Sequence, residues 1–111
     1  MKEKIDLFIE LSLQQCKKDD YGDSKKVKLH NEATEKLTRL KMQMSDIETK
    51  EMLMLLNYND SRVKINAAQF CFEKQVLIED AINSLNEVVN TEKDTTLNFS
   101  AKILLENGTK S

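Results

Sequence analysis

The sequence predicts an all-α fold, and three observations support this prediction. The 111 residues include two glycines, no proline and 5% aromatic residues, whereas β-sandwiches and barrels need turn residues and aromatic or β-branched strands. Apolar residues recur at the i, i+3, i+4 spacing of one helical face along most of the chain. A helix–turn–helix pattern also repeats after 33 to 34 residues. At about 150 residues per domain, the length indicates one domain, 1–111.

Residues 1–44 are expected to form an N-terminal helix pair. The first helix should cover 3–17, and its apolar stripe consists of Ile5, Phe8, Ile9, Ser12, Leu13 and Cys16, widened by Leu7 and Leu11. The charged segment 17–23 contains Gly22 and is typical of a loop. A second helix should cover 24–42, with an inward stripe of Val27, His30, Ala33, Leu37, Leu40 and Met44.

Residues 45–74 are expected to form a first helical hairpin. Ser45-Asp46-Ile47-Glu48 has the form of a capping box, which predicts that a helix begins there and ends near Asn57. Asp60 or Ser61 should cap the next helix. Its predicted inward residues are Val63, Ala67, Phe70 and Cys71, and its predicted outward or border residues are Arg62, Asn66, Gln69 and Glu73.

Residues 75–108 are expected to form a second hairpin. Its first helix should cover 77–89, with Ile78, Ala81, Ile82, Leu85 and Val88 facing inward. Its second helix should begin at Asp94 or Thr95, bury Leu97, Ala101, Leu104 and Leu105, and stop at Asn107-Gly108.

The two hairpins are copies of one pattern. A shift of 33 residues places 55–57 on 88–90, and a shift of 34 places Asp60 on Asp94, Val63 on Leu97 and Ala67 on Ala101. Each copy has an apolar helix end, a polar turn, an acidic cap, and an aliphatic residue four positions before an alanine. Stacked helical hairpins of this kind form an α-solenoid.

The stretch LLNYNDSRVKINAAQF, residues 55–70, resembles the core of a HEAT repeat, in which a leucine pair and a turn ending in Asp precede Val-Arg/Lys and Ala-Ala. Nearly the whole chain is similar to a small bacterial HEAT-like domain family of unknown function. Lys64 stands where Arg is more usual, and the 57–60 turn lacks the common proline. The resemblance implies a right-handed α-α superhelix of about six helices in three antiparallel hairpins. It also implies protein binding without enzymatic activity.

The residue types needed for catalysis or metal binding are sparse. Cys16 and Cys71 are 55 residues apart, His30 is the one imidazole, and the chain has no CxxC, GxGxxG, P-loop or HExxH motif. We therefore expect no catalytic site, no metal and no cofactor, with both cysteines buried and reduced. No segment approaches the roughly 20 apolar residues of a membrane span, which predicts a cytoplasmic protein that does not enter the membrane.

Charge favours another protein as the partner. Residues 1–44 carry 10 basic and 8 acidic residues, whereas 45–111 carry 7 and 11, and the segment 75–92 has four acids and no Lys or Arg. An acidic surface here would attract a basic partner, so the chain could be a cytosolic immunity or inhibitor protein that binds a basic toxin domain. The alternative is that these acids form only a solvated surface that keeps the helix soluble. The second helices of the two hairpins should also line a polar, mixed-charge concave groove. The candidate protein-binding residues are Arg62, Asn66, Gln69, Glu73, Glu79, Asp80, Glu87, Asn98 and Lys102.

Three alternatives remain open at this stage. Asn66 could bond a neighbouring backbone inside the stack instead of binding a partner. The chain could be a scaffold or regulatory subunit, homodimeric through its apolar N-terminal helix. Weak nucleic-acid binding is the least favoured, because Asp19, Asp20 and Asp23 are interspersed among the lysines that would contact phosphates, Lys17, Lys18, Lys25, Lys26 and Lys28.

Overall fold

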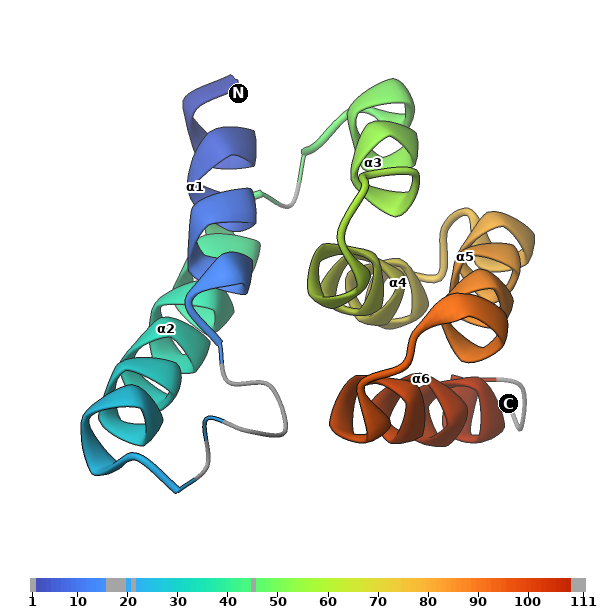
Figure 1. Cartoon of the computed structure of the whole chain (residues 1–111). Coiled ribbons are helices and arrows are strands. Elements are labelled where there is room, and N and C mark those ends of the chain that lie inside the picture. The colour runs from blue at the N-terminus through green and yellow to red at the C-terminus, as the bar shows by residue number, and fades with distance from the viewer. Residues whose placement is uncertain (1, 16–19, 21, 45, 109–111) are drawn as a thin grey trace.

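A computed structural model describes residues 2–15, 20, 22–44 and 46–108, and within these ranges it contains six α-helices and no strand. The all-α prediction is therefore confirmed. In chain order the helices are α1 (Lys2–Leu13), α2 (Ser24–Gln43), α3 (Thr49–Leu56), α4 (Ser61–Lys74), α5 (Ile78–Thr91) and α6 (Thr95–Gly108) (Figure 1).

Among helices that follow one another in the chain, α1 packs on α2, α3 on α4, α4 on α5, and α5 on α6. Among helices farther apart in the chain, α4 contacts α6 and α1, α3 contacts α5, and α1 contacts α3. Helix α4 is central in Figure 1, with α3 above it, α5 beside it, α6 below it and the α1–α2 pair on its other side. It contacts α1, α3, α5 and α6, which leaves little of its circumference exposed to solvent.

One hydrophobic core connects these helices. The Phe8 ring of α1 stacks on the Phe70 ring of α4, with 6.4 Å between ring centroids and an interplanar angle of 25°. Aromatic pairs in this geometry stabilise by about 0.5–1.5 kcal/mol beyond the burial of their area. The largest fully buried side chains are Phe8, Ile5, Met44, Met52, Leu55, Leu56, Leu85, Leu97, Val63, Val88 and Cys71.

Aspartate caps begin three of the helices. The Asp60 carboxylate accepts a hydrogen bond from the Val63 amide at 3.1 Å, and that of Asp94 accepts from Thr96 and Leu97 at 3.0 and 3.1 Å. Asp23 accepts in the same way from Lys25 at 2.9 Å. Each carboxylate satisfies amides that have no partner within the helix. The predicted caps at Asp60 and Asp94 are confirmed.

The start of α3 and the end of α1 differ from the predictions. Glu48 is the N-cap of α3, with an extended backbone (φ −74°, ψ 148°) and no side-chain cap hydrogen bond. It therefore cannot occupy the third helical position of a capping box, and the predicted start was wrong. Ser45 lies outside the described residues. Helix α1 ends at Leu13 rather than at 17, and Leu13 and Leu7 are 53% and 42% exposed. Cys16 and Lys17 also lie outside the described ranges.

Two further differences concern α5 and α6. Gln75 and Leu77 have positive φ values of 57° and 49°, so the chain turns sharply and leaves Ile78 36% exposed instead of inward. Gly108 is the last residue of α6, not a residue beyond its end, and its φ is not positive. A Cβ at this position would come closer than 3.0 Å to three atoms of the Phe72 ring. The glycine therefore allows close packing against Phe72, and α6 ends at Gly108 as predicted.

Candidate functional site

A cleft of about 410 Å³ is lined by residues of α4 and α6. Its lining residues are Arg62, Ile65, Asn66 and Gln69 from α4, and Phe99, Ser100, Ile103, Leu104 and Asn107 from α6. Phe99 and Ile103 are 64% and 40% exposed. Three of the predicted binding residues of α4 therefore come together with an apolar wall from α6, where a polar wall was expected.

A second cleft, of about 460 Å³, lies between α2 and α4. It is lined by Thr38, Lys41, Met42, Gln69, Phe70, Glu73 and Lys74. The Lys41 Nζ lies 3.2 Å from the Glu73 Oε1 and joins the two helices across this cleft. Met42 is 77% exposed, and the Lys74 Nζ lies 5.6 Å from the centroid of the Phe70 ring. Gln69 lines both clefts, which we call together the α4 grooves.

Asn66 attaches the N-terminal helix pair to α4. Its Nδ2 donates to the Ser12 Oγ at 2.9 Å and to the Gln15 Oε1 at 2.8 Å. Ser12 is fully buried and donates to the Phe8 carbonyl, and the Gln15 Nε2 donates to the Thr34 Oγ1 of α2 at 2.8 Å. Asn66 therefore has an internal structural role through side chains rather than through the backbone, although one edge of it still lines the cleft.

Arg62 was expected at the outer border of its helix, but it is 8% exposed. The reason is the central position of α4, which contacts helices on several sides. Burial, and secondarily the positive charge of Arg62, lower the pKa of His30 below its ordinary value. Both effects disfavour the protonated imidazole. The lowered pKa therefore favours the neutral imidazole of His30.

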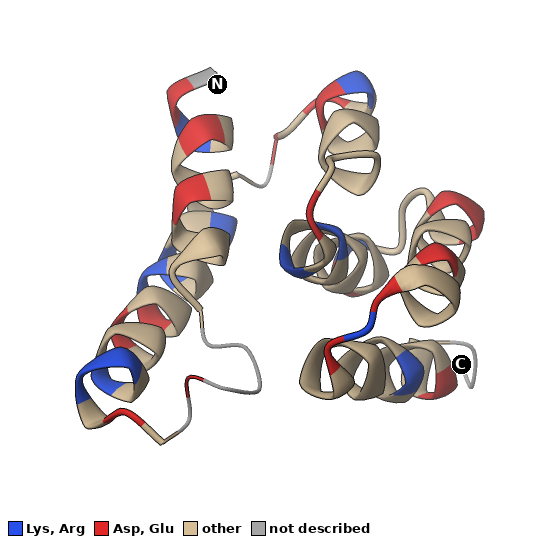
Figure 2. Ribbon diagram, in the orientation of Figure 1, with Lys and Arg blue, Asp and Glu red and all other residues tan. Residues whose placement is uncertain are grey.

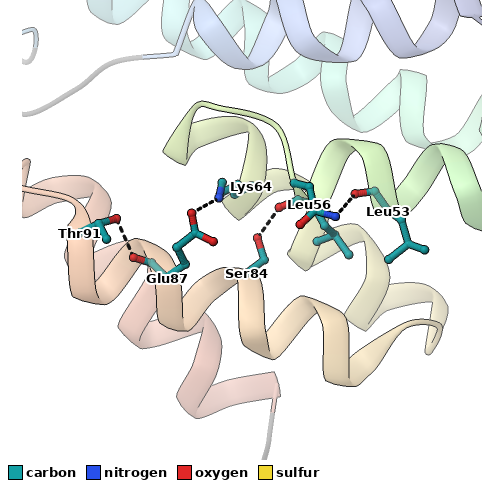
Figure 3. Close-up of polar contacts among 7 residues, drawn as sticks. Leu53, Leu56, Lys64, Ser84, Glu87 and Thr91 are labelled. Atoms are coloured by element: carbon teal, nitrogen blue, oxygen red, sulfur yellow. Dashed lines mark hydrogen bonds and ion pairs between the residues drawn. The ribbon is translucent and has the colours of Figure 1, made fainter.

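Lys64 is a residue that the sequence reasoning did not select. Its Nζ lies 2.6 Å from the Glu87 Oε1 of α5, and its side chain is 10% exposed against 59% for Glu87 (Figure 3). Figure 3 also shows the Ser84 hydroxyl of α5, which donates to the Leu56 carbonyl at 2.7 Å. These contacts join α5 to α4 and to the end of α3. No local pattern links Lys64 with Glu87, because they are 23 positions apart on different helices.

The acidic residues of segment 75–92 are distributed along α5 and just after its end. Glu79 and Asp80 occupy the first turn of α5, about 12 Å along the axis from Glu87 at 1.5 Å per residue. Acidic segments appear at both ends of α5 in Figure 2. Glu87 is paired with Lys64, and the Glu92 carboxylate accepts from the Asp94 amide. Glu79 and Asp80 remain as an exposed acidic pair, and binding to a basic partner stays a prediction.

Asn98 and Lys102 do not line either of the α4 grooves. The Asn98 Nδ2 donates to the Val89 and Glu92 carbonyls at 2.8 and 3.2 Å. It thus provides hydrogen-bond donors to backbone carbonyl groups at the end of α5. Lys102 is exposed on α6. Adjacent helical residues point about 100° apart. The side chains that face the cleft are therefore those that directly follow Asn98 and Lys102, namely the apolar Phe99 and Ile103.

Cys71 is a free cysteine buried in the core. Burial, with a smaller contribution from the charge of Asp80, raises the pKa of the fully buried Cys71 thiol to about 12. Cys71 is therefore protonated at neutral pH. The described residues contain no group of three His, Cys, Asp or Glu side chains that could hold a metal ion.

The lysines proposed for nucleic-acid contact lie at the start of α2 or before it. Lys26 pairs with Asp20 at 3.1 Å, and Lys25 and Lys28 are exposed. Lys17 and Lys18 lie outside the described residues. None of the helices in the described part of the chain is long and apolar enough to cross a membrane.

The chain has no match among family models, curated proteins or solved structures.

Proposed function

We propose that the chain is a non-enzymatic protein-binding module, built as a HEAT-like right-handed stack of three hairpins, whose partner binds along the α4 grooves. The contacts between helix pairs support this architecture. The first helices of successive pairs contact one another, α1 with α3 and α3 with α5, and α4 contacts α6 as well as α1 and α5. Such nearest-neighbour contacts are expected of stacked hairpins, whose second helices line one side of the stack.

The exposure of Phe99 is the observation that carries the proposal. This large aromatic side chain is 64% exposed beside a cleft of about 410 Å³ and lies one helical turn from the partly exposed Ile103. Amide side chains of Asn66, Gln69 and Asn107 line the same cleft. Apolar anchors next to polar groups are typical of protein interfaces, where aromatic residues provide much of the binding free energy.

The positions of Cys71 and His30, and the raised pKa of Cys71, favour binding over catalysis. Cys71 is buried and its pKa is raised to about 12, so it is a poor nucleophile at neutral pH. Neither Cys71 nor His30 lines the α4 grooves. The residues that line the α4 grooves supply amides, hydroxyls, apolar groups and charges. Such groups bind the surface of another protein.

The test compares Phe99→Ser with Met54→Ser. Met54 is 52% exposed on α3 and does not line the α4 grooves, so it controls for the loss of an exposed apolar side chain. Proteins captured from the native lysate are quantified by mass spectrometry for wild type and both variants. Phe99→Ser should weaken capture of a stoichiometric partner at least about ten-fold, as loss of an aromatic anchor does, and Met54→Ser should not. Equal capture by both variants would exclude the α4 grooves as the binding site.

A second candidate function is a homodimeric scaffold that associates through α1. Leu7 and Leu13 of α1 are 42% and 53% exposed, which leaves two apolar side chains outside the core. Sedimentation equilibrium of the full chain at micromolar concentrations tests this candidate. A dimer that Leu13→Ser dissociates is the expected result, and a monomer across the concentration range would reject it.

A further inference from the structure

The last turn of α6 contains Asn107 followed directly by Gly108. The side-chain amide of an asparagine is open to attack by the backbone nitrogen of the next residue, and a side chain on that next residue obstructs the attack. Glycine has no Cβ and lets other atoms approach its backbone closely. Asn107 is the one asparagine of the sequence that a glycine follows, so local sequence makes its amide the most susceptible to this attack.

The Asn107 side chain is exposed and is not held in place by its neighbours. Among the described residues, none forms a hydrogen bond with its amide group. Other asparagines of the chain are held: the Asn66 and Asn98 amides each donate two hydrogen bonds, and the Asn57 amide donates one. The amide carbon of Asn107 is therefore free to turn toward the Gly108 nitrogen.

Packing against Phe72 requires the same glycine that permits the attack. A Cβ at position 108 would come closer than 3.0 Å to three atoms of the Phe72 ring. The attack also requires Asn107 to leave its helical conformation, because the nitrogen and the amide carbon must come into near-attack contact. The last carbonyls of a helix have no partner within it, and such terminal turns open locally at low cost. Folding therefore slows the attack without preventing it.

We propose that Asn107 is a site of spontaneous deamidation. The Gly108 nitrogen forms a bond to the Asn107 Cγ and loses its proton, and the side-chain nitrogen leaves as ammonia. Water then opens the resulting cyclic imide at either of its two carbonyl carbons, which gives aspartate or isoaspartate. The complete reaction consumes one water and releases one ammonia, without a change of oxidation state.

The product changes the end of a cleft to which the proposed function assigns the partner. Asn107 lines the cleft that contains Phe99 and Ile103. Deamidation replaces its neutral amide with a carboxylate in the last turn of α6, where the helix dipole disfavours negative charge. Isoaspartate also lengthens the backbone by one carbon and moves Gly108 out of its helical register against Phe72. Resting on the proposed function, the inference is that deamidation weakens binding of the partner.

Ageing of the purified full chain at mildly alkaline pH tests the modification site. Samples are digested and analysed by mass spectrometry, and the same chain unfolded in urea gives the rate for an open backbone. Asn107 should be converted before any other asparagine, more slowly in the folded chain than in urea. Asn107 that stays intact in the folded chain for several half-times of the unfolded control, or earlier conversion of another asparagine, would overturn the proposal.

Variants of Gly108 test the mechanism of the attack. In a Phe72→Leu background, where the ring contact is removed, Gly108→Ala should slow conversion of Asn107 at least about ten-fold, because the new methyl group obstructs the nitrogen. Phe72→Leu alone should speed conversion in the folded chain and leave the rate in urea unchanged. Equal rates with glycine and alanine at position 108 would exclude attack by this nitrogen.

Asn107→Asp reproduces one product and tests the effect on binding. It should lower the Tm by about 1–5 °C and weaken Phe99-dependent capture from lysate at least about three-fold, since a carboxylate beside apolar contacts is costly to desolvate. Asn86→Asp, at an exposed position of α5 outside these clefts, is the matched control and should not change capture.

The outcomes separate this inference from the proposed function. If Asn107 is deamidated but Asn107→Asp captures the partner as well as wild type does, the effect on binding is overturned and the modification site stands. If Phe99→Ser weakens capture but the folded chain does not deamidate at Asn107, the proposed function stands and this inference fails. If neither Phe99→Ser nor Asn107→Asp changes capture, the proposed function fails, and the ageing result alone decides the modification site.

Discussion

The substitution Asn66→Ala separates an internal role of Asn66 from a role in binding. The Asn66 Nδ2 donates at 2.9 Å to the buried Ser12 Oγ and at 2.8 Å to the Gln15 Oε1, so alanine removes two hydrogen bonds between α4 and the N-terminal segment. If Asn66 served binding alone, its replacement would change the affinity for a partner and leave the free energy of unfolding unchanged. The structure leads us to expect a loss of stability.

The expected loss follows from the two contacts. Each hydrogen bond contributes about 0.5–1.5 kcal/mol net, and the Gln15 side chain is partly exposed, so water can replace its bond. The sum is about 1–2 kcal/mol. Alanine also stabilises a helix by up to about 0.7 kcal/mol relative to asparagine. Asn86→Ala, at an exposed position of α5, measures this helix contribution alone.

Urea and thermal unfolding followed by circular dichroism compare the two variants. Asn66→Ala should be about 1–2 kcal/mol less stable than Asn86→Ala, which corresponds to roughly 4–9 °C in Tm for 111 residues. In a double-mutant cycle, Ser12→Ala should be coupled to Asn66→Ala. Equal stability of Asn66→Ala and Asn86→Ala would refute the reasoning, because it would mean that these hydrogen bonds do not hold α1 against α4.

Three further predictions concern Gly108, His30 and the acidic pair on α5. Gly108→Ala should destabilise by about 1–3 kcal/mol, because the new methyl group would overlap the Phe72 ring; in a Phe72→Leu background the same change should be neutral, and an equal loss in both backgrounds would exclude this contact as the cause. Since the pKa of His30 is lowered in the folded state, the folded chain binds this proton less readily than the unfolded chain, and stability should fall as pH drops below 6.5. Between about pH 7 and about pH 5, the Tm of His30→Gln should therefore decrease less than the Tm of the wild type. Identical decreases would contradict this prediction. Reversing Glu79 and Asp80 to lysine should slow association with a basic partner and Glu32→Lys on α2 should not; an association rate that does not change with salt would exclude this steering.

Local sequence was sufficient for the helices and for two of their caps. Asp60 and Asp94 begin α4 and α6 as predicted, because a cap requires one carboxylate within three residues of the amides that it satisfies. The stripe of Ala33, Leu37 and Leu40 is buried as predicted, since α2 buries a single face. These features depend on neighbours within one or two turns, and a single sequence contains that information.

The predictions for α4 were less complete, because this helix contacts four others. Hydrophobic periodicity identifies one buried face, whereas α4 buries Arg62 and Lys64 as well as its apolar stripe. Burial of Lys64 depends on Glu87 from another helix, and the position of Asn66 depends on Ser12 from a third. No spacing within the sequence shows that these residues meet.

In the candidate site, too, some features depend on local sequence and others on contacts between helices. The sequence by itself determined that residues 60–73 and 94–106 form a pair of related helices, and it selected Arg62, Asn66 and Gln69, which do line one cleft. Only the tertiary structure decided that Phe99 and Ile103, rather than Asn98 and Lys102, complete that cleft. It also decided that Glu87 is neutralised by Lys64 and lies apart from Glu79. The physical reason is that helix formation depends on local spacing, whereas the chemistry of a groove depends on how each helix is rotated against its neighbours.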